Sequence, residues 1–318
     1  MKHKEGNKMN YAFGIDVGGT SVKIGFFNEA FDLLESFSIP TNTEQQGKYI
    51  LKDIKDAIMA FLKEKNIDEN DVLGYGFGVP GPVVHNHILK CVNLGWKHLK
   101  IDEAFQALMG KSVIVRSGND ATLAALGEYT QMDLKKDICF ITLGTGVGGG
   151  IIIGGKGHEG ANGAGAEFGH MKLDYDNPEP CTCGLSGCFE TVASIRGITR
   201  IAEEILRKKT LSTTLKKDKL NPKTIFDAAR KGDAVGLKVL EVVSDYIGQA
   251  CANIALIVDP EEFIIGGGIS NAGDILIDAI KEAYVRHAFF GVKHTKFSIA
   301  KLGNNAGMYG AAQLILDK

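Results

Sequence analysis

The chain has 318 residues, 44% of them hydrophobic, and a formal net charge of −2. This length predicts two α/β lobes, and the near-neutral charge argues against bulk attraction to nucleic acid or an anionic membrane. The longest apolar stretches, such as 250–258, are far shorter than the ~20 residues of a membrane span, and the polar start, 1–10, has no apolar signal segment. Six cysteines are not typical of a secreted disulfide scaffold in a chain of this length. We therefore expect a cytoplasmic protein without nucleic-acid or membrane partners.

Apolar periodicity predicts strands and helices in alternation, which is typical of an α/β fold. In chain order, we expect strands at 12–15 and 22–27, a helix at 48–65, strands at 72–79 and 112–116, a helix at 119–130, strands at 138–143 and 151–153, helices at 195–208, 225–231 and 234–258, a strand at 263–265, and helices at 275–289 and 306–316. The segment 210–223, rich in Lys and Thr, is expected to be a mobile loop.

A glycine-rich turn between two apolar runs occurs twice. The first turn is Gly18-Gly19-Thr20, shortly after Asp16, and the second lies within 144–150. Both are predicted to be hairpin tips with little side chain, where backbone N–H groups can bind phosphate. Asp16 adds an oxygen ligand suited to Mg²⁺. A plain tight hairpin that needs glycine for positive φ is the alternative at each tip. The two tips, with a third glycine run at 266–268, favour two half-domains that grip one polyphosphate, as in a nucleotide-dependent kinase.

Two commoner glycine motifs fit less well. The spacing from Gly150 to Lys156 is that of a P-loop, but Gly157 stands where Ser or Thr is required. The run 144–149 matches G-x-G-x-x-G, with Glu167 at about the distance of a ribose-binding acid. A dinucleotide site needs a helix after this turn, however, and the β-branched residues 151–153 predict a strand. A dinucleotide site is therefore the less favoured alternative.

A second strong motif is His170 followed by Cys181, Cys183 and Cys188, with the pattern H-x10-C-x-C-x4-C. Three thiolates and one imidazole complete a closed tetrahedral Zn²⁺ shell, which is typical of a structural site. The alternative is three reduced cysteines that share a loop by chance. Free cysteines prefer burial in apolar runs, whereas these three lie among Gly, Pro and Thr. The sequence therefore predicts a zinc loop.

These residues together resemble the ROK family (repressors, open reading frames, kinases) from Gly14 to the last helix. The most specific segment runs from Glu167-Phe168-Gly169-His170 to Glu190 and is similar to the family pattern E-x-G-H…C-x-C-G-x-x-G-C-x-E. The resemblance implies a two-lobed, actin-like ATPase fold of the ribonuclease H-like kind, with the zinc loop in the larger lobe. We expect a smaller lobe of 10–118 plus 305–318 and a larger lobe of 119–304.

The resemblance also implies two sets of binding residues. For ATP with Mg²⁺ they are Asp16, Gly18, Gly19, Thr20, Lys23, Thr145, Gly146, Gly266, Gly267 and Gly268; for a sugar they are Gly81, Asn93, Asn119, Asp120, Glu167, His170 and Glu190. Carboxylates and amides suit a sugar because each can serve two hydroxyls. His170 would be shared, with one ring nitrogen on zinc and the other toward a sugar hydroxyl.

Asp120 is the candidate catalytic base. It follows a predicted strand and opens a predicted helix, so its carboxylate can lie at a cleft edge and accept the proton of the attacking hydroxyl. Helix capping is the alternative role for Asn119 and Asp120; the surrounding motifs favour catalysis. We therefore predict an enzyme that transfers the γ-phosphoryl of Mg·ATP to the 6-hydroxyl of a hexose.

Within the family the chain looks most like the glucokinases, and glucose is the favoured sugar. N-acetylmannosamine and N-acetylglucosamine kinases have nearly the same motifs and stay the alternative. The family resemblance also implies a homodimer or homotetramer. A non-catalytic sugar sensor is less favoured, because only about ten residues precede the first predicted strand, too few for a DNA-reading helix pair. The basic residues in 3–8 are interpreted as a solvated tail.

Overall fold

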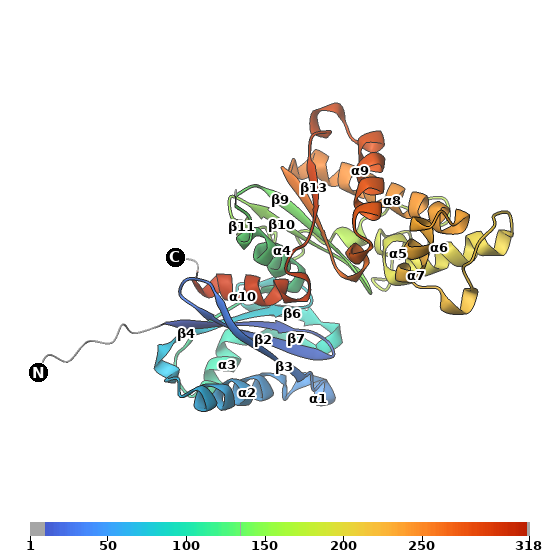
Figure 1. Cartoon of the computed structure of the whole chain (residues 1–318). Helices are drawn as coiled ribbons and strands as arrows, with labels where there is room; N and C mark the ends of the chain where they lie inside the picture. Colours follow the sequence, from blue (N-terminus) through green and yellow to red (C-terminus); the bar gives the residue numbers. More distant parts are fainter. Residues whose placement is uncertain (1–9, 134, 317–318) are drawn as a thin grey trace, which may run out of the picture. The chain divides into compact units, whose positions relative to one another are not determined.

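The computed structural model describes residues 10–133 and 135–316 and contains two compact units (Figure 1), which we describe separately. The first unit comprises 10–133, Gly155–Gly165 and 304–316; the second comprises 135–154 and Ala166–Gly303. The polar start with its basic segment 3–8 lies outside the described residues.

The first unit contains a five-stranded mixed sheet in the order β3-β2-β1-β4-β8. Its strands are β1 (Tyr11–Val17), β2 (Ser21–Asn28), β3 (Leu33–Pro40), β4 (Val72–Val79) and β8 (Ile114–Asn119). The first three pair antiparallel, whereas β4 is parallel to both β1 and β8. The inner strands β1 and β4 are almost wholly buried because helices cover both faces of the sheet.

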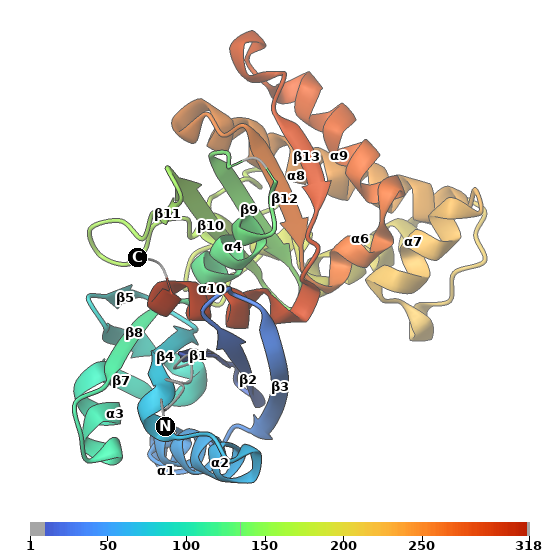
Figure 2. The same ribbon diagram turned by 60° about the vertical axis from the view of Figure 1, so that its left-hand side comes forward.

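One face of this sheet carries α2 (Ile50–Lys65) and α3 (Ile101–Met109), and the other carries α10 (Ala306–Leu316), as Figures 1 and 2 show. The helix α10 lies very close to the strands. A Cβ on Gly76 would come 1.8 Å from the backbone oxygen of Ala311, so this position requires glycine. The helix α4 (Asp120–Thr130) packs against α10 in the same unit.

A small antiparallel sheet, β5-β6-β7, and a short helix complete the first unit. Their bounds are β5 (Val83–Val84), β6 (His87–Cys91), β7 (Trp96–Lys100) and α1 (Glu44–Gly47). The two-residue strand β11 (Lys156–Gly157) belongs to the segment Gly155–Gly165.

The second unit contains a sheet in the order β10-β9-β12-β13. Its strands are β9 (Ile138–Leu143), β10 (Val147–Ile153), β12 (Glu262–Gly266) and β13 (Lys296–Ile299), and its helices are α5 (Glu190–Ala193), α6 (Ile195–Lys208), α7 (Pro222–Arg230), α8 (Ala234–Val258) and α9 (Asp274–His287). The apolar faces of β9 and β12 share one core with α6, α8 and α9. The long helix α8 anchors this core because about half of its residues are buried.

Most predicted elements are confirmed, and five of them, 72–79, 138–143, 195–208, 234–258 and 306–316, coincide with β4, β9, α6, α8 and α10. The strand predicted at 112–116 instead runs from Ile114 to Asn119, directly into α4. The compact units also differ from the expected lobes, 10–118 with 305–318 and 119–304. The first unit includes α4, because it packs against α10, and the segment Gly155–Gly165.

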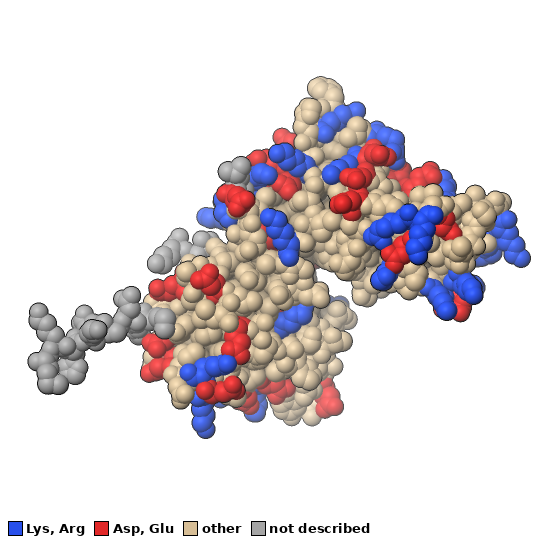
Figure 3. Space-filling model, viewed as in Figure 1, with Lys and Arg blue, Asp and Glu red and all other residues tan. Residues whose placement is uncertain are grey.

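Acidic and basic side chains are interspersed on the face shown in Figure 3, in keeping with the small net charge. Among the described residues, no helix has both the length and the apolar character needed to cross a membrane.

Candidate functional site

The first glycine-rich turn is the tip of the β1–β2 hairpin, as predicted. The N–H of Gly18 donates to the oxygen of Ser21 at 3.1 Å, and the hydroxyl of Thr41 donates to the oxygen of Gly18 at 2.7 Å. Gly19 and Thr20 are exposed. The tip therefore presents backbone to solvent while its base is held by hydrogen bonds.

Asp16 and Lys23 face each other across this hairpin. They are register partners, and Lys23 Nζ lies 3.7 Å from Asp16 Oδ2 while donating to the oxygen of Asn304 at 2.8 Å. Burial raises the pKa of Asp16, and Lys23 opposes that effect. Space for the carboxylate depends on Gly307, whose added Cβ would lie 2.9 Å from Asp16 Cγ. An acid and a base thus lie together beside the bare tip, an arrangement suited to a metal-bound phosphate.

The second glycine-rich turn is the tip of the β9–β10 hairpin. The N–H of Gly144 donates to the oxygen of Gly146 at 2.9 Å, and Thr145 at the tip is exposed. The N–H of Val147 donates to Glu190 Oε2 at 3.1 Å, and a Cβ on Gly146 would come 2.4 Å from that same oxygen. Glu190 therefore braces this tip, and a side chain at 146 would displace the Glu190 carboxylate.

The third glycine run follows β12 and approaches β9. Gly267 has φ +81°, and an added Cβ would lie 2.3 Å from the oxygen of Leu143. Leu143 is the last residue of β9 and leads into the second tip. The run 266–268 and Thr145–Gly146 thus lie at the same end of one sheet, because β12 and β9 are parallel neighbours.

Asn119 and Asp120 lie where β8 passes into α4. Asn119 Oδ1 accepts from the N–H groups of Ala121 and Thr122 at 3.0 and 3.1 Å, so Asn119 is the N-cap of α4. Its Nδ2 donates to the oxygen of Gly81 at 3.3 Å. Asp120, the first helical residue, accepts the Ala121 N–H at 2.8 Å. Both readings of this pair, capping and a site at a strand end, are therefore compatible with the structure.

Asn93 and Gly81 lie in the loops beside this strand end. Asn93 is exposed, and a Cβ added to Gly19 would lie 3.7 Å from Asn93 Cβ, so Asn93 neighbours the first hairpin tip. Gly81 has φ +107°, which favours glycine. The first unit thus brings Gly81, Asn119 and Asp120 together and places Asn93 beside the tip.

Glu167 has an unusual backbone setting. Its φ of −68° and ψ of 53° are those of an inverse γ-turn, closed by the Phe168 N–H donating to the oxygen of Ala166 at 2.7 Å. Ala166 has φ +65°, a left-handed conformation that is rare for alanine. The one-turn helix η3 (Phe168–His170) follows, and the N–H of His170 donates to the oxygen of Glu167 at 3.1 Å. This turn fixes Glu167 and His170 relative to each other.

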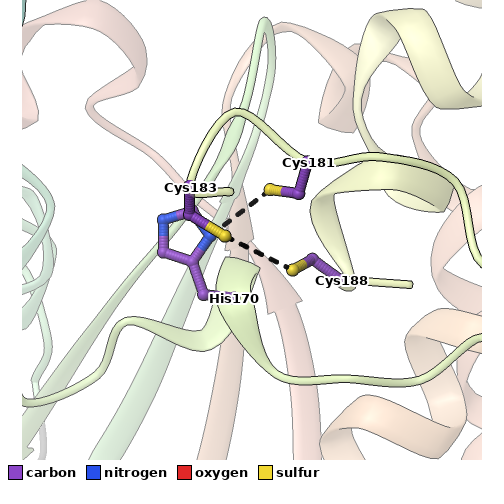
Figure 4. A group of neighbouring side chains, drawn as sticks. All are labelled: His170, Cys181, Cys183 and Cys188. Carbon is purple, nitrogen blue, oxygen red and sulfur yellow. Dashed lines mark hydrogen bonds between the residues drawn. The ribbon is translucent and has the colours of Figure 1, made fainter. Parts of the chain in front are cut away.

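His170, Cys181, Cys183 and Cys188 converge in the second unit, with their ligand atoms all within 4.8 Å of one another. Figure 4 shows the imidazole and the thiols directed toward a common centre. Cys181 Sγ lies 3.7 Å from His170 Nδ1, and Cys183 Sγ lies 3.7 Å from Cys188 Sγ. Ligands ~2.0–2.3 Å from one tetrahedral ion are separated by about 3.5–3.8 Å. The donor set and its spacing therefore fit Zn²⁺.

Glu190 connects this cysteine loop to the hairpin tip. Its Oε1 accepts from the hydroxyl of Thr182 at 3.4 Å and lies 3.9 Å from Cys181 Sγ, whereas its Oε2 binds the Val147 N–H. The predicted site residues divide between the two units. The second unit contains Glu167, His170, Glu190, Thr145, Gly146 and Gly266–Gly268, and the first unit contains the other residues predicted to bind sugar and phosphate.

Glu159 lies beside the end of β8, close to Asn119 and Asp120, and the sequence motifs did not identify it. It lies in Gly155–Gly165, and a Cβ on Gly118 would come 2.8 Å from its Oε1. Burial raises its pKa, while the Asn119 backbone N–H and the charge of His85 lower it. Glu159 stands next to a short glycine-rich stretch and has no spacing pattern, so only the three-dimensional arrangement reveals it.

Two α/β units, each with a mixed sheet opened by a glycine-tipped hairpin, fit the actin-like ATPase class of folds. The family model described as "ROK family" matches residues 12–318, and the chain belongs to this family.

Relatives and solved structures agree with this assignment. A protein named glucokinase from Halalkalibacterium halodurans is 39% identical over 311 residues, covering 95% of this chain and 94% of that protein. The crystal structure of a ROK family glucokinase from Streptomyces griseus in complex with glucose and AMPPNP has a TM-score of 0.75 and 32% identity, covering 96% of this chain and 98% of that chain. An N-acetyl-D-glucosamine kinase from Haemophilus influenzae is 28% identical, covering 96% of this chain and 99% of that protein.

Proposed function

We propose that this protein is an ATP-dependent glucokinase that transfers the γ-phosphoryl of Mg·ATP to the 6-hydroxyl of glucose. The observation that carries the proposal is Asp120 at the start of α4, next to Asn119 and Gly81. The similarity to proteins named glucokinase over nearly the whole chain supports glucose as the sugar.

The two hairpin tips hold the phosphates in this proposal. Asp16 would hold Mg²⁺, Lys23 would add positive charge, and Gly18, Gly19 and Thr20 would offer backbone N–H groups. Thr145 and Gly146 bind from the second unit, and Gly266–Gly268 approach the nucleoside because they lack side chains. Magnesium supplies neutralisation of the charge that develops on the transferred phosphoryl group.

Asp120 orients the 6-hydroxyl and accepts its proton as the oxygen attacks the γ-phosphorus. Asn93, Asn119, Glu167 and Glu190 bind sugar hydroxyls, since amides and carboxylates accept or donate in pairs. Gly81 leaves room for the ring. These roles fit side chains that already have fixed partners, because Asn119 caps α4 and Glu190 braces the second tip.

The cysteine loop holds a structural Zn²⁺ through His170, Cys181, Cys183 and Cys188. The donor set is closed, so a bound ion would supply rigidity to the loop and would leave no open position for substrate. With one ring nitrogen on the metal, the other nitrogen of His170 has a fixed tautomer and can donate to a sugar hydroxyl. Zinc thereby fixes both His170 and the loop that contacts Glu190.

The test is a coupled ADP-release assay on the wild type and Asp120→Asn with glucose and Mg·ATP. Asp120→Asn is expected to lower kcat by about 10²–10⁴-fold or more, because the base is lost, while glucose binding is largely retained. Asp274→Asn is the matched control: Asp274 is exposed and also opens a helix, α9, so its substitution alters a helix start without touching the site. Turnover of Asp120→Asn within tenfold of the wild type would refute the assignment.

The same assay separates the sugars. Glucose, mannose, fructose, N-acetylglucosamine and N-acetylmannosamine are compared under one condition, and glucose is expected to lead by at least about tenfold in kcat/KM. The relative named N-acetyl-D-glucosamine kinase makes the N-acetylated sugars the alternative. An N-acetylated sugar in the lead would keep the mechanism and replace the substrate. If folded, zinc-loaded protein releases no ADP with any of these sugars, the result would instead favour a non-catalytic sugar sensor.

We also place the protein in the cytoplasm, as a homodimer or homotetramer. The six cysteines, all among the described residues, form no disulfide, which suits a reducing compartment that also supplies ATP. Large apolar side chains are exposed on the second unit, among them Ile257 at 83% and Phe290 at 75%, and a second copy of the chain would cover such a surface. Light scattering of the purified protein should give a mass of two or four chains; a monomer would contradict the assembly.

A further inference from the structure

The segment Gly155–Gly165, which we call the returning segment, belongs to the first unit although the chain on both sides of it belongs to the second. It is a closed loop, because the N–H of Gly165 donates to the oxygen of Glu159 at 2.7 Å. Close backbone approaches hold it on the first unit. A Cβ on Gly163 would come 2.5 Å from the oxygen of Val83, and one on Gly155 would come 3.2 Å from the hydroxyl of Tyr129.

Glu159 is the residue of the returning segment that reaches the end of β8. Its neighbours Lys156 and His158 are exposed, whereas Glu159 is half-buried. Its carboxylate lies against Gly118, where an added Cβ would come 2.8 Å from Oε1, and the neighbouring backbone N–H of Asn119 lowers its pKa. His85, at the tip of the β5–β6 turn, lies close enough for its charge to lower the pKa of Glu159. Because Gly118 has no side chain, the Glu159 carboxylate can approach the end of β8 at this position.

Both side-chain groups of Asn119 are already engaged, because its oxygen caps α4 and its nitrogen donates to Gly81. A hydrogen bond from its backbone N–H to the nearby Glu159 carboxylate would add a third point of fixation. A carboxylate that accepts this N–H fixes the peptide plane between Gly118 and Asn119, and with it the direction in which α4 leaves β8. Asp120 is the first residue of α4, so its carboxylate moves with that direction.

We propose that Glu159 is a positioning residue: its carboxylate holds the Asn119 N–H and thereby fixes the orientation of the Asp120 carboxylate toward the acceptor hydroxyl. The inference rests on the proposed role of Asp120. A misplacement of about 1 Å costs up to ~10²-fold in rate, so the effect of losing Glu159 falls mainly on kcat. Glucose affinity is shared among several residues and changes less.

The test compares Glu159→Ala, Glu159→Gln and the matched control His158→Ala, an exposed neighbour in the same segment. Glu159→Ala is expected to lower kcat by about tenfold or more with a glucose Kd within about threefold of the wild type. Glu159→Gln keeps an oxygen that accepts the N–H, so kcat should recover to within about threefold. His158→Ala should match the wild type. Melting temperatures are recorded, and rates are measured well below them.

A second readout does not depend on activity. In amide spectra of the full-length protein, the Asn119 N–H resonance should shift as Glu159 titrates, and Glu159→Gln should abolish that titration. If Glu159→Ala does not fold, this comparison and Glu159→Asp, which withdraws the carboxylate by one methylene, decide the question.

The outcomes separate the two proposals. Three results would each overturn the positioning role. They are a kcat of Glu159→Ala within twofold of the wild type, a Glu159→Gln variant as impaired as Glu159→Ala, and an Asn119 resonance that does not shift as Glu159 titrates. Activity retained in Asp120→Asn would instead overturn the proposed function, whatever the Asn119 resonance does.

Discussion

Asn119 caps the helix that Asp120 begins: its Oδ1 accepts the N–H groups of Ala121 and Thr122 at 3.0 and 3.1 Å. The residue expected to bind sugar is thus also the residue that ends the strand and starts the helix of the proposed base. The Asn119 side chain is therefore both structural and, in the proposal, functional. Its structural role arises because the free N–H groups at the start of α4 need an acceptor. Substitutions at 119 can separate these two roles.

Asn119→Ala removes both roles, whereas Asn119→Ser keeps a capping oxygen and loses the amide that donates to Gly81. Asn119→Ala is expected to lower the free energy of unfolding by about 1 kcal/mol, and Asn119→Ser by a few tenths. Both should raise the KM for glucose by about tenfold or more, since the amide is lost in each. Denaturant unfolding and steady-state kinetics measure the two effects. Full glucose affinity in Asn119→Ser would show that the amide does not bind the sugar.

Zinc content is the next prediction. Purified protein should contain one Zn²⁺ per chain by elemental analysis, and Cys181→Ser or Cys188→Ser should lose it, because each removes one of four ligands. Chelation should lower the melting temperature and raise the KM for glucose, since the loop that holds Thr182 against Glu190 loses its support.

Cys251→Ala is the matched control for these cysteine variants, because Cys251 is buried in α8 and belongs to no ligand cluster among the described residues. It should keep its zinc. Metal-free protein with an unchanged glucose KM would contradict a link between the loop and the sugar site.

The sequence predicted the hairpin tips and the cysteine cluster well because each depends on local patterns. Glycine between apolar runs determined both hairpins, and the spacing of His170 and the cysteines was enough to bring four side chains together. The long helices 195–208 and 234–258 were also clear, since their apolar periodicity is strong over many residues.

Elements that depend on distant partners were missed. The strands β5, β6 and β7 are short and lack a regular alternation of apolar and polar residues, and only their pairing in space makes them a sheet. The polar edge strand β3 is stabilised by antiparallel pairing with β2, and no local sequence pattern predicts it. Glu159 belongs to the same class: its neighbour Asn119 is 40 positions earlier, so no spacing rule links the two.

Ala166 offers a test of backbone strain beside Glu167. Its φ of +65° costs about 1–2 kcal/mol for an L-residue, and glycine would relieve that cost while losing about 0.4–1 kcal/mol to chain entropy. Ala166→Gly is therefore expected to raise the free energy of unfolding by about 0.5–1 kcal/mol. Ala161→Gly is the control, because Ala161 lies in the neighbouring loop without a positive φ; it should be neutral or destabilising. An Ala166→Gly protein less stable than the wild type would show that the turn needs the methyl group.

The last prediction concerns the ion pair between Lys136, which precedes β9, and Glu262, the first residue of β12. Lys136 Nζ lies 2.8 Å from Glu262 Oε2, and the Ser298 hydroxyl donates to Oε1 at 2.6 Å. Burial alone raises the pKa of Glu262, but these two donors outweigh it and hold the pKa below its usual value. A lowered folded-state pKa means that the stabilisation is present above the unfolded value near 4.5 and is lost as the pH falls through the folded one.

Glu262→Gln should therefore lower the free energy of unfolding at pH 7 by about 1–2 kcal/mol, because the charge-assisted bond to Lys136 is lost. The difference from the wild type should shrink as the pH falls from about 4.5 through the lower pKa of the folded carboxyl, because the wild-type side chain then takes up a proton and the ion pair is lost. Urea unfolding of both proteins between pH 7 and pH 4 measures it. Glu241→Gln serves as the control, since its ion pair with Lys238 is exposed and should contribute little at any pH. A Glu262→Gln deficit that does not change with pH would assign the effect to packing and contradict the ionic account.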